Sequence, residues 1–151
     1  MRFPFLAVLA VLAVLALIAV ASSAEARNTR LEISFADTLQ RGADEGVLDG
    51  SVRFFLAGQA HPAVQSLLGN GASSRKTNAV GKSDENACQW AALSVLKAFQ
   101  EQAKQKGANA VVNVVSNYNR VEFRGDGVIE CRAGGLMAGV ALKGEYATVA
   151  P

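Results

Sequence analysis

Residues 84–115 read DENACQWAALSVLKAFQEQAKQKGANAVVNVV, and the hydrophobic period changes within them. In the first part, small and apolar residues recur at helical steps and form one stripe: Cys88, Ala92, Val95, Phe99 and Ala103. Ser83 or Asp84 can cap this segment, and Gly107 is a natural stop. We therefore predict an amphipathic helix over 84–106 with Cys88 on its core face.

After this helix the pattern becomes that of a strand. Residues 108–115 are rich in β-branched side chains, and the pattern continues to Phe123. Gly125-Asp126-Gly127 then predicts a hairpin turn into a second strand over 128–142. Within that strand, a Gly-Gly pair at 134–135 marks a bulge or a close backbone approach. The tail after residue 144 is expected to form a short edge or to stay loose.

Upstream of the helix the strand signals are weaker. Apart from an alternation of apolar and polar residues near Ile33, residues 27–50 read as weakly structured. A strand is expected over 51–57, and 63–68 fits either helical turns or a strand. Residues 69–82 are polar and extended, as is typical of an edge strand. The whole pattern predicts an α+β domain, an antiparallel sheet with one main helix packed on one face.

The N-terminus has the features of an export signal. Met1-Arg2 gives a basic start, residues 3–20 carry no charge, and Ala24-Glu25-Ala26 is the small-x-small pattern that a signal peptidase reads. We predict that residues 1–26 are cleaved and that 27–151, beginning at Arg27, form a single periplasmic or secreted domain. The apolar run is also long enough to span a bilayer, so a retained anchor is the alternative.

The charge balance limits the kinds of partner. The 15 basic and 13 acidic residues are scattered and give a net charge of +2. They form neither a nucleic-acid stripe nor a polybasic membrane patch. We therefore expect no nucleic-acid partner, and no membrane partner once the signal is removed.

Cys88 and Cys131 are the two cysteines. An even count in an exported chain favours a disulfide, which would stabilise the fold by about 4 kcal/mol. Two separate buried thiols are the alternative. Redox catalysis is disfavoured, because the chain has neither a C-x-x-C motif nor a third cysteine.

The segment Gly107-Ala108-Asn109-Ala110-Val111-Val112, at the end of the helix, resembles a pattern in small exported bacterial proteins of the RcsF-like and YbjQ-like families. The likeness covers about residues 71–143 and implies an RcsF/YbjQ-like fold. The RcsF-like resemblance implies a disulfide between the helix start and the last strand, which fits Cys88 and Cys131. That family's second disulfide and lipid-bearing cysteine are absent here. Some YbjQ-like proteins form rings, so a structural protein that assembles into a ring or dimer is kept as an alternative function.

The chain is also similar to short exported bacterial proteins commonly labelled "excinuclease ATPase subunit". The similarity lies in His61-Pro62-Ala63-Val64, in KTNAVGKSDE at 76–85 and in the segment at 107–112. Gly81-Lys82-Ser83 before a helix matches part of a phosphate-binding loop. That loop also needs a glycine at position 76, where this chain has Lys, so we interpret the label as wrong. Nucleotide or anion binding at this helix start is kept as an alternative function.

No pattern assigns a catalytic residue, a cofactor or a metal. His61 is the single histidine, and a metal site built with it would need both cysteines as thiolates. A small basic cluster, Arg75, Lys76 and Lys82 with Ser83, is a possible anion or partner contact. We predict a non-catalytic, envelope-associated binding domain whose partner is a protein or polymer.

Overall fold

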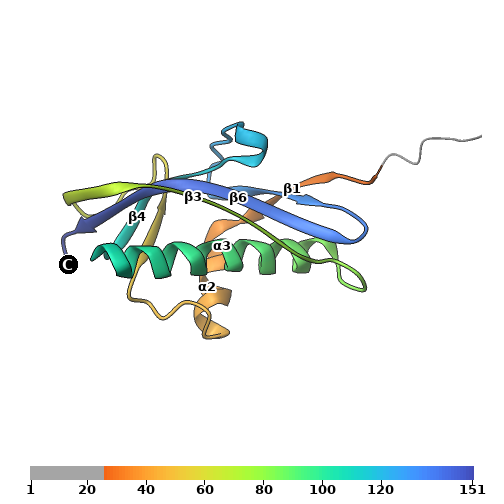
Figure 1. The fold of residues 1–151 in the computed structure, drawn as a ribbon, viewed down its shortest axis with the longest axis horizontal. Helices are drawn as coiled ribbons and strands as arrows, with labels where there is room; N and C mark the ends of the chain where they lie inside the picture. Colours follow the sequence, from red (N-terminus) through yellow and green to blue (C-terminus); the bar gives the residue numbers. More distant parts are fainter. Residues whose placement is uncertain (1–25) are drawn as a thin grey trace, which may run out of the picture.

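The computed structural model describes residues 26–151, so the expectations for Ala24 and the rest of residues 1–25 lie outside it. The described chain is α+β, a curled mixed sheet of six strands with two helices (Figure 1). The elements in order are β1 (Thr29–Ser34), α2 (Phe35–Asp44), β2 (Arg53–Leu56), β3 (Val64–Asn78), α3 (Asp84–Lys106), β4 (Ala110–Ser116), the 3-10 turn η1 (Tyr118–Arg120), β5 (Val128–Ala133) and β6 (Met137–Val149).

The long strand β6 is the centre of the sheet. On one side it pairs with β3 along almost its whole length, from Asn78↔Met137 to Val64↔Val149. Its other side pairs first with β5 and then with β4, so these two strands lie end to end. β1 and β2 complete the sheet beside β5 and β4. The expectation of an antiparallel sheet is corrected, because β2 pairs with β4 in parallel.

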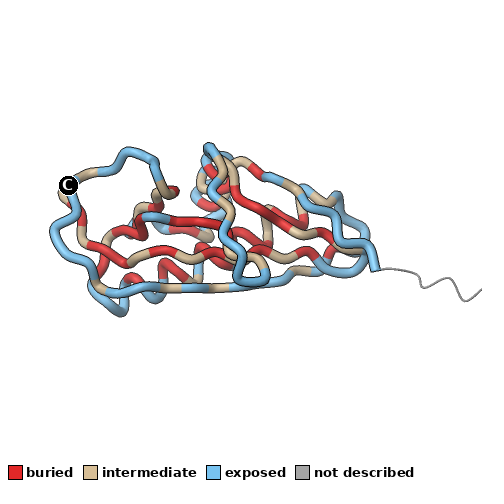
Figure 2. Tube along the Cα trace, turned by 90° about the horizontal axis from the view of Figure 1, so that it is seen from above, coloured by how far each residue is buried: buried red, intermediate tan, exposed pale blue. Residues whose placement is uncertain are grey.

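The helix α3 begins and ends where the sequence pattern predicts. The Ser83 hydroxyl caps it by accepting the N–H of Asn86 at 3.2 Å, and the helix ends before Gly107. The predicted stripe faces the sheet, and Val95 and Phe99 are at most 1% exposed. Figure 2 shows buried residues along the middle of the domain, with exposed loops around them.

The Cys88–Cys131 disulfide is confirmed. Its two Cα atoms are 5.8 Å apart, and both cysteines are fully buried. The bond joins the N-terminal part of α3 to β5, the strand before the last, and so connects the two layers of the fold. A buried disulfide fits an oxidising compartment.

The predicted hairpin between 108–123 and 128–142 is wrong. β4 ends at Ser116, and the chain turns away through η1, where Asn119 and Arg120 are left-handed (φ 51° and 63°). The tight hairpin lies instead between β5 and β6, across the Gly-Gly pair. A Cβ on Gly134 would lie 3.0 Å from the carbonyl oxygen of Arg27, which is the close approach that the glycines indicate. The tail expected to be loose is the buried end of β6, because it pairs with both β3 and β4.

Residues 27–50 contain more regular structure than the sequence pattern indicates. β1 covers the expected alternation, and α2 follows it directly, capped by the hydroxyl of Ser34. Gly42 lies inside α2 because a Cβ there would be 2.6 Å from Leu48 Cδ1. A glycine in the middle of a helix weakens the sequence signal for that helix. Of the two readings of 63–68, the structure shows a strand, the start of β3.

No helix within residues 26–151 combines the length and the apolar character that crossing a bilayer requires.

Candidate binding site on the outer face of the sheet

The two faces of the sheet differ in what covers them. One face packs against α3, and we call the opposite face the outer face. On β6, Val140, Leu142 and Tyr146 point into the core cluster that α3 covers, so the alternate residues Lys143 and Glu145 lie on the outer face. In Figure 1 the connection through η1 rises above this outer face, on the side away from α3.

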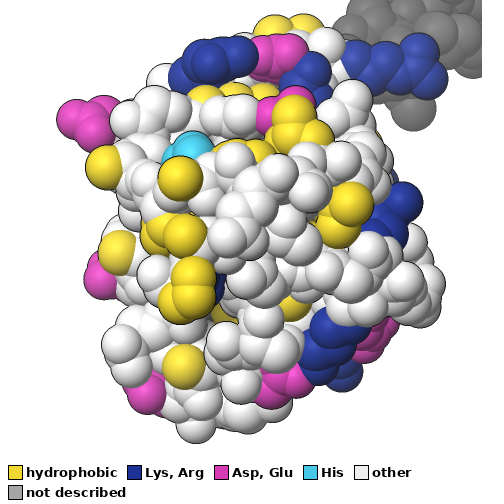
Figure 3. Space-filling model, turned by 90° about the vertical axis from the view of Figure 1, so that its left-hand side faces the viewer, with side chains coloured by type: hydrophobic (Ala, Val, Ile, Leu, Met, Phe, Trp, Pro, Cys, Tyr) yellow, Lys and Arg dark blue, Asp and Glu magenta, His cyan; other side chains and the backbone are white. Residues whose placement is uncertain are grey.

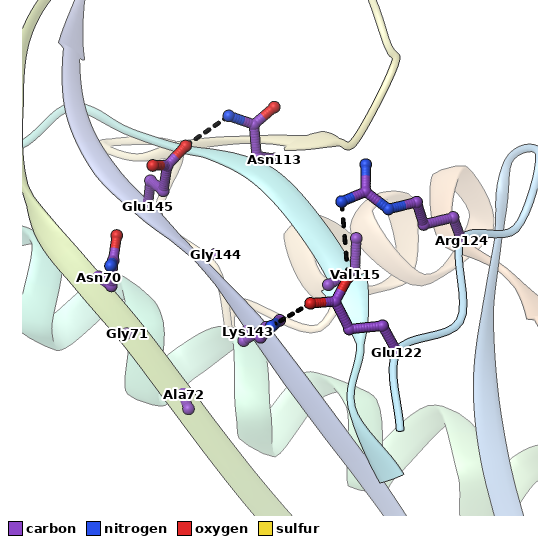
Figure 4. A pocket seen from close by; sticks show the side chains of 10 residues that line it. All are labelled: Asn70, Gly71, Ala72, Asn113, Val115, Glu122, Arg124, Lys143, Gly144 and Glu145. Atoms are coloured by element: carbon purple, nitrogen blue, oxygen red, sulfur yellow. Dashed lines mark hydrogen bonds and ion pairs between the residues drawn. The ribbon is translucent and has the colours of Figure 1, made fainter. Parts of the chain in front are cut away.

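A hollow of about 650 Å³ lies on the outer face (Figure 4). Its floor consists of residues from three strands, which are Asn70 to Ala72 of β3, Lys143 to Glu145 of β6, and Asn113 and Val115 of β4. Its wall is Glu122 and Arg124, from the segment that follows η1. The hollow therefore brings together three distant parts of the chain, which are residues 70–72, 113–124 and 143–145.

A β-bulge at Asn113 shapes one end of this hollow. Val112 pairs with Glu145 and Val115 with Lys143, so β4 has one more residue than β6 between these two pairs. The extra residue, Asn113, has φ 53°, a left-handed conformation that Asn adopts more readily than most residues. Its side-chain amide donates a hydrogen bond to Glu145. The bulge thus turns a polar side chain toward the hollow from a strand that is otherwise rich in valine.

At the other end of the hollow, three charged side chains interact. Glu122 forms ion pairs with Lys143 and, at 3.5 Å, with Arg124. The hydrogen bond from Lys143 is the main cause that lowers the pKa of Glu122 below its ordinary value of 4.5. Together with Glu145, the hollow contains two carboxylates and two cations, so its formal charges balance.

We expect the pKa of Glu122 to rise toward 4.5 in a Lys143→Met variant, measured by carbon NMR titration of the carboxyl group. Because the folded-state pKa is lowered, this pair stabilises the fold above the unfolded-state pKa. The stabilisation is lost as the pH falls through the folded-state value. Arg124→Met is the control and should give a smaller rise, since Arg124 contributes least to the shift. An equal rise of the Glu122 pKa in the two variants would contradict the conclusion that Lys143 is the main cause of the lowered pKa.

The wall of the hollow is held in place from the side of β1 and β5. Glu130 accepts hydrogen bonds from Arg132 at 2.7 Å and from Arg30 at 3.2 Å. The two guanidinium groups in turn lie over aromatic rings, Arg30 over Phe123 at 4.5 Å and Arg132 over Tyr118 at 5.0 Å. Since Phe123 lies between Glu122 and Arg124, these contacts fix the wall before any ligand arrives.

The structure does not bring the predicted basic cluster together. Arg75 and Lys76 are neighbours on a strand and therefore point to opposite faces of the sheet. The Lys82 ammonium donates to the carbonyl oxygen of Asn78 at 2.9 Å, inside the turn before α3. The Ser83 hydroxyl is engaged as the helix cap. Of these four residues, only Lys76 lies on the outer face.

His61 lies at the end of the domain where β3 begins. Its Nδ1 is 2.8 Å from the carbonyl oxygen of Pro62, and its ring packs 5.5 Å from that of Phe55. Figure 3 shows this end, with the histidine among apolar side chains. Within residues 26–151, no group of three His, Cys, Asp or Glu side chains could hold a metal ion.

Sequence reasoning missed the residues of the hollow: Asn113, Glu122, Arg124, Lys143 and Glu145. One signal was present, since Asn113 interrupts the run Val111-Val112-Asn113-Val114-Val115. Asn adopts the left-handed conformation that this bulge requires more readily than valine does. Lys143 and Glu145 also alternate with buried residues on β6, but that pattern alone does not show which loop covers them.

The sequence matches no protein-family model and no curated protein. The resemblance to RcsF-like and YbjQ-like proteins therefore stays a prediction, and the function is argued from the geometry of the outer face.

Proposed function

We propose that the chain is a non-catalytic binding domain of the cell envelope, and that its outer face contacts a protein or polymer partner. The observation that carries this proposal is the hollow of about 650 Å³, whose floor and wall are fixed by ion pairs and cation–π contacts. A preformed polar hollow is typical of a binding site, because little ordering is needed when the ligand arrives.

The chemistry of the hollow favours a polar partner of low net charge. Asn70 and Asn113 supply amide groups, Lys143 and Arg124 donate hydrogen bonds, and Glu122 and Glu145 accept them. Peptide groups and sugar hydroxyls match such a mixed set. Both carboxylates already have partners, Lys143 for Glu122 and Asn113 for Glu145, which supports binding rather than acid–base work.

Site-specific photo-crosslinking in the source cells tests this proposal. Benzoylphenylalanine in place of Ala72, which lines the hollow and is exposed, should form a discrete adduct. The same group in place of the exposed Lys97 on α3 is the control and should form none. Glu145→Gln should reduce the adduct at position 72. Equal adducts at 72 and 97, or turnover of a substrate that is lost in His61→Ala, would overturn the proposal.

We also infer that the working form is the exported domain. An intact mass from a periplasmic extract should correspond to a chain that begins at Arg27 and is lighter by two hydrogens until reduction. A full-length mass with two free thiols would contradict both export and the disulfide in the cell. A full-length chain that keeps its disulfide would instead support the retained membrane anchor.

A second candidate function, self-association, is favoured by the free edge of β3. Within the described chain, β3 pairs only with β6. The edge of β3 that faces away from β6 therefore has no strand partner over Val64–Asn78. The exposed Leu67 adds an apolar contact on this edge strand. Sedimentation should then show a dimer or ring that Leu67→Lys dissociates. Val121→Lys, at a somewhat more exposed position outside the sheet, is the control. A wild-type protein that stays monomeric at all concentrations would contradict self-association.

A further inference from the structure

A second hollow, of about 490 Å³, lies on the same outer face and is lined by β3, η1 and β6. It shares Ala72 with the first hollow. Its charged lining residues are both cations, Lys76 from β3 and Arg120 from η1, so we call it the Lys76–Arg120 hollow. Uncharged donors lie around them, from Ser74 and from the side chains at 117–119.

Neither cation of this hollow has an ion-pair partner within residues 26–151. The carboxylates that line the first hollow and its wall interact elsewhere: Glu122 with Lys143 and Arg124, Glu130 with two other arginines, and Glu145 with the Asn113 amide. Lys76 and Arg120 are both exposed and carry a formal charge of two between them. The first hollow is therefore balanced, while the second has an unneutralised positive charge.

The backbone beside this hollow is held in an unfavourable conformation. Asn119 and Arg120 are consecutive left-handed residues, with φ of 51° and 63°, and for arginine this region is sparsely populated. Hydrogen bonds hold the turn, from the Arg120 N–H to Asn117 at 3.2 Å and from the Val121 N–H to Tyr118 at 3.0 Å. Such strain clusters at ligand sites. Here the strained turn places Arg120 in the lining of the hollow.

We propose that the Lys76–Arg120 hollow binds a phosphate group of a ligand. Two positive charges match a phosphate dianion, and guanidinium, ammonium and hydroxyl donors from two separate elements suit a tetrahedral group with several oxygens. This inference rests on the proposed binding function and gives the same outer face a ligand class. The phosphate can belong to a soluble molecule or to a lipid headgroup.

The test is an NMR titration of the purified, disulfide-bonded protein with inorganic phosphate, at constant ionic strength and about pH 8, where the second proton is lost. Amide shifts should saturate and be confined to Ser74, Lys76 and Arg120. The double variant Lys76→Ala/Arg120→Ala should weaken binding about tenfold or more. Lys97→Ala, which removes an exposed lysine of α3, is the control and should bind as the wild type does.

Arg120→Gly separates loss of binding from loss of folding. Glycine accepts φ of 63° without strain, so this variant should melt at or above the wild-type temperature and still lose phosphate binding. Shifts spread equally over Lys82 and Lys97, or unchanged binding in the double variant, would overturn the inference by showing an adventitious ion only.

Vesicles of phosphatidylglycerol distinguish the two sources of phosphate. Binding of vesicles and of inorganic phosphate, both lost in the double variant, would assign a lipid headgroup. Phosphate binding without vesicle binding would assign a soluble ligand. If phosphate does not bind while the adduct at position 72 persists, the phosphate inference falls and the binding function stands. If neither phosphate binding nor the adduct at position 72 is observed, both the phosphate inference and the proposed binding function fall.

Discussion

Removal of the Cys88–Cys131 disulfide is expected to lower the free energy of unfolding by about 4 kcal/mol. The bond closes a loop between cysteines 43 residues apart in the sequence, and breaking it enlarges the unfolded ensemble by the freedom that this loop regains. It also joins β5 directly to the start of α3. A loss of this size would shift the melting temperature by roughly 15 °C in a domain of this length.

The measurement is urea denaturation of three forms: the oxidised protein, the reduced protein and the double variant Cys88→Ala/Cys131→Ala. Alanine is the right replacement because both side chains are fully buried, and a serine hydroxyl there would lack a partner. The reduced form and the double variant should lose similar amounts of stability. If reduction left the urea midpoint unchanged, the bond would contribute nothing to the folded domain.

Phe99→Ala should be comparably destabilising, by about 3–5 kcal/mol. Phe99 lies at the middle of the buried face of α3, is 1% exposed, and packs edge-on against Tyr146 of β6 with ring centroids 6.0 Å apart. Truncation would leave a cavity at the centre of the contact between the helix and the sheet, which two rigid elements cannot close.

Two further variants calibrate this result. Phe99→Leu fills much of the same space and should cost less than Phe99→Ala. Lys97→Ala, on the exposed face of the same helix, should change stability by no more than about 0.5 kcal/mol. Thermal and urea denaturation that gave equal losses for Phe99→Ala and Lys97→Ala would show that α3 does not pack on the sheet as described.

The helix over 84–106 could be predicted to the residue because its signals are local. A cap, a repeating apolar stripe and a stop glycine lie within 25 residues or so of one another and need no information about the rest of the chain. The disulfide could be predicted for a different reason, since two cysteines allow only one intramolecular pair.

Strand pairing could not be predicted in the same way. The Asp-Gly turn at 126–127 and the strand pattern on either side are typical of a hairpin. In the structure β4 pairs with the far end of β6 on one side and with β2 on the other, so both of its partners are distant in the sequence. The turn at Asn119 and Arg120 carries no glycine, so only its two asparagines indicate that the chain leaves the sheet there.

The candidate site shows the same difference between local sequence signals and long-range pairing. The basic residues near 75–82 lie close in sequence, and alternation along β3 and the turn before α3 separates them in space. The hollows are built instead from β3, β6 and the segment after β4, whose contacts are set by tertiary pairing. Only Lys76 belongs to both the predicted cluster and the observed surface.

The central place of β6 determines when this domain can form. β6 is the last strand of the described chain, yet β3, β4 and β5 all pair with it, and β1 reaches the rest of the sheet only through β5. Without β6, β3 has no strand to pair with, the pairs β1–β5 and β2–β4 are not joined, and α3 has only part of a surface to cover. A chain that lacks residues 137–149 would therefore keep two separate strand pairs with no strand to join them, and loss of this one segment should disrupt the whole sheet rather than shorten it.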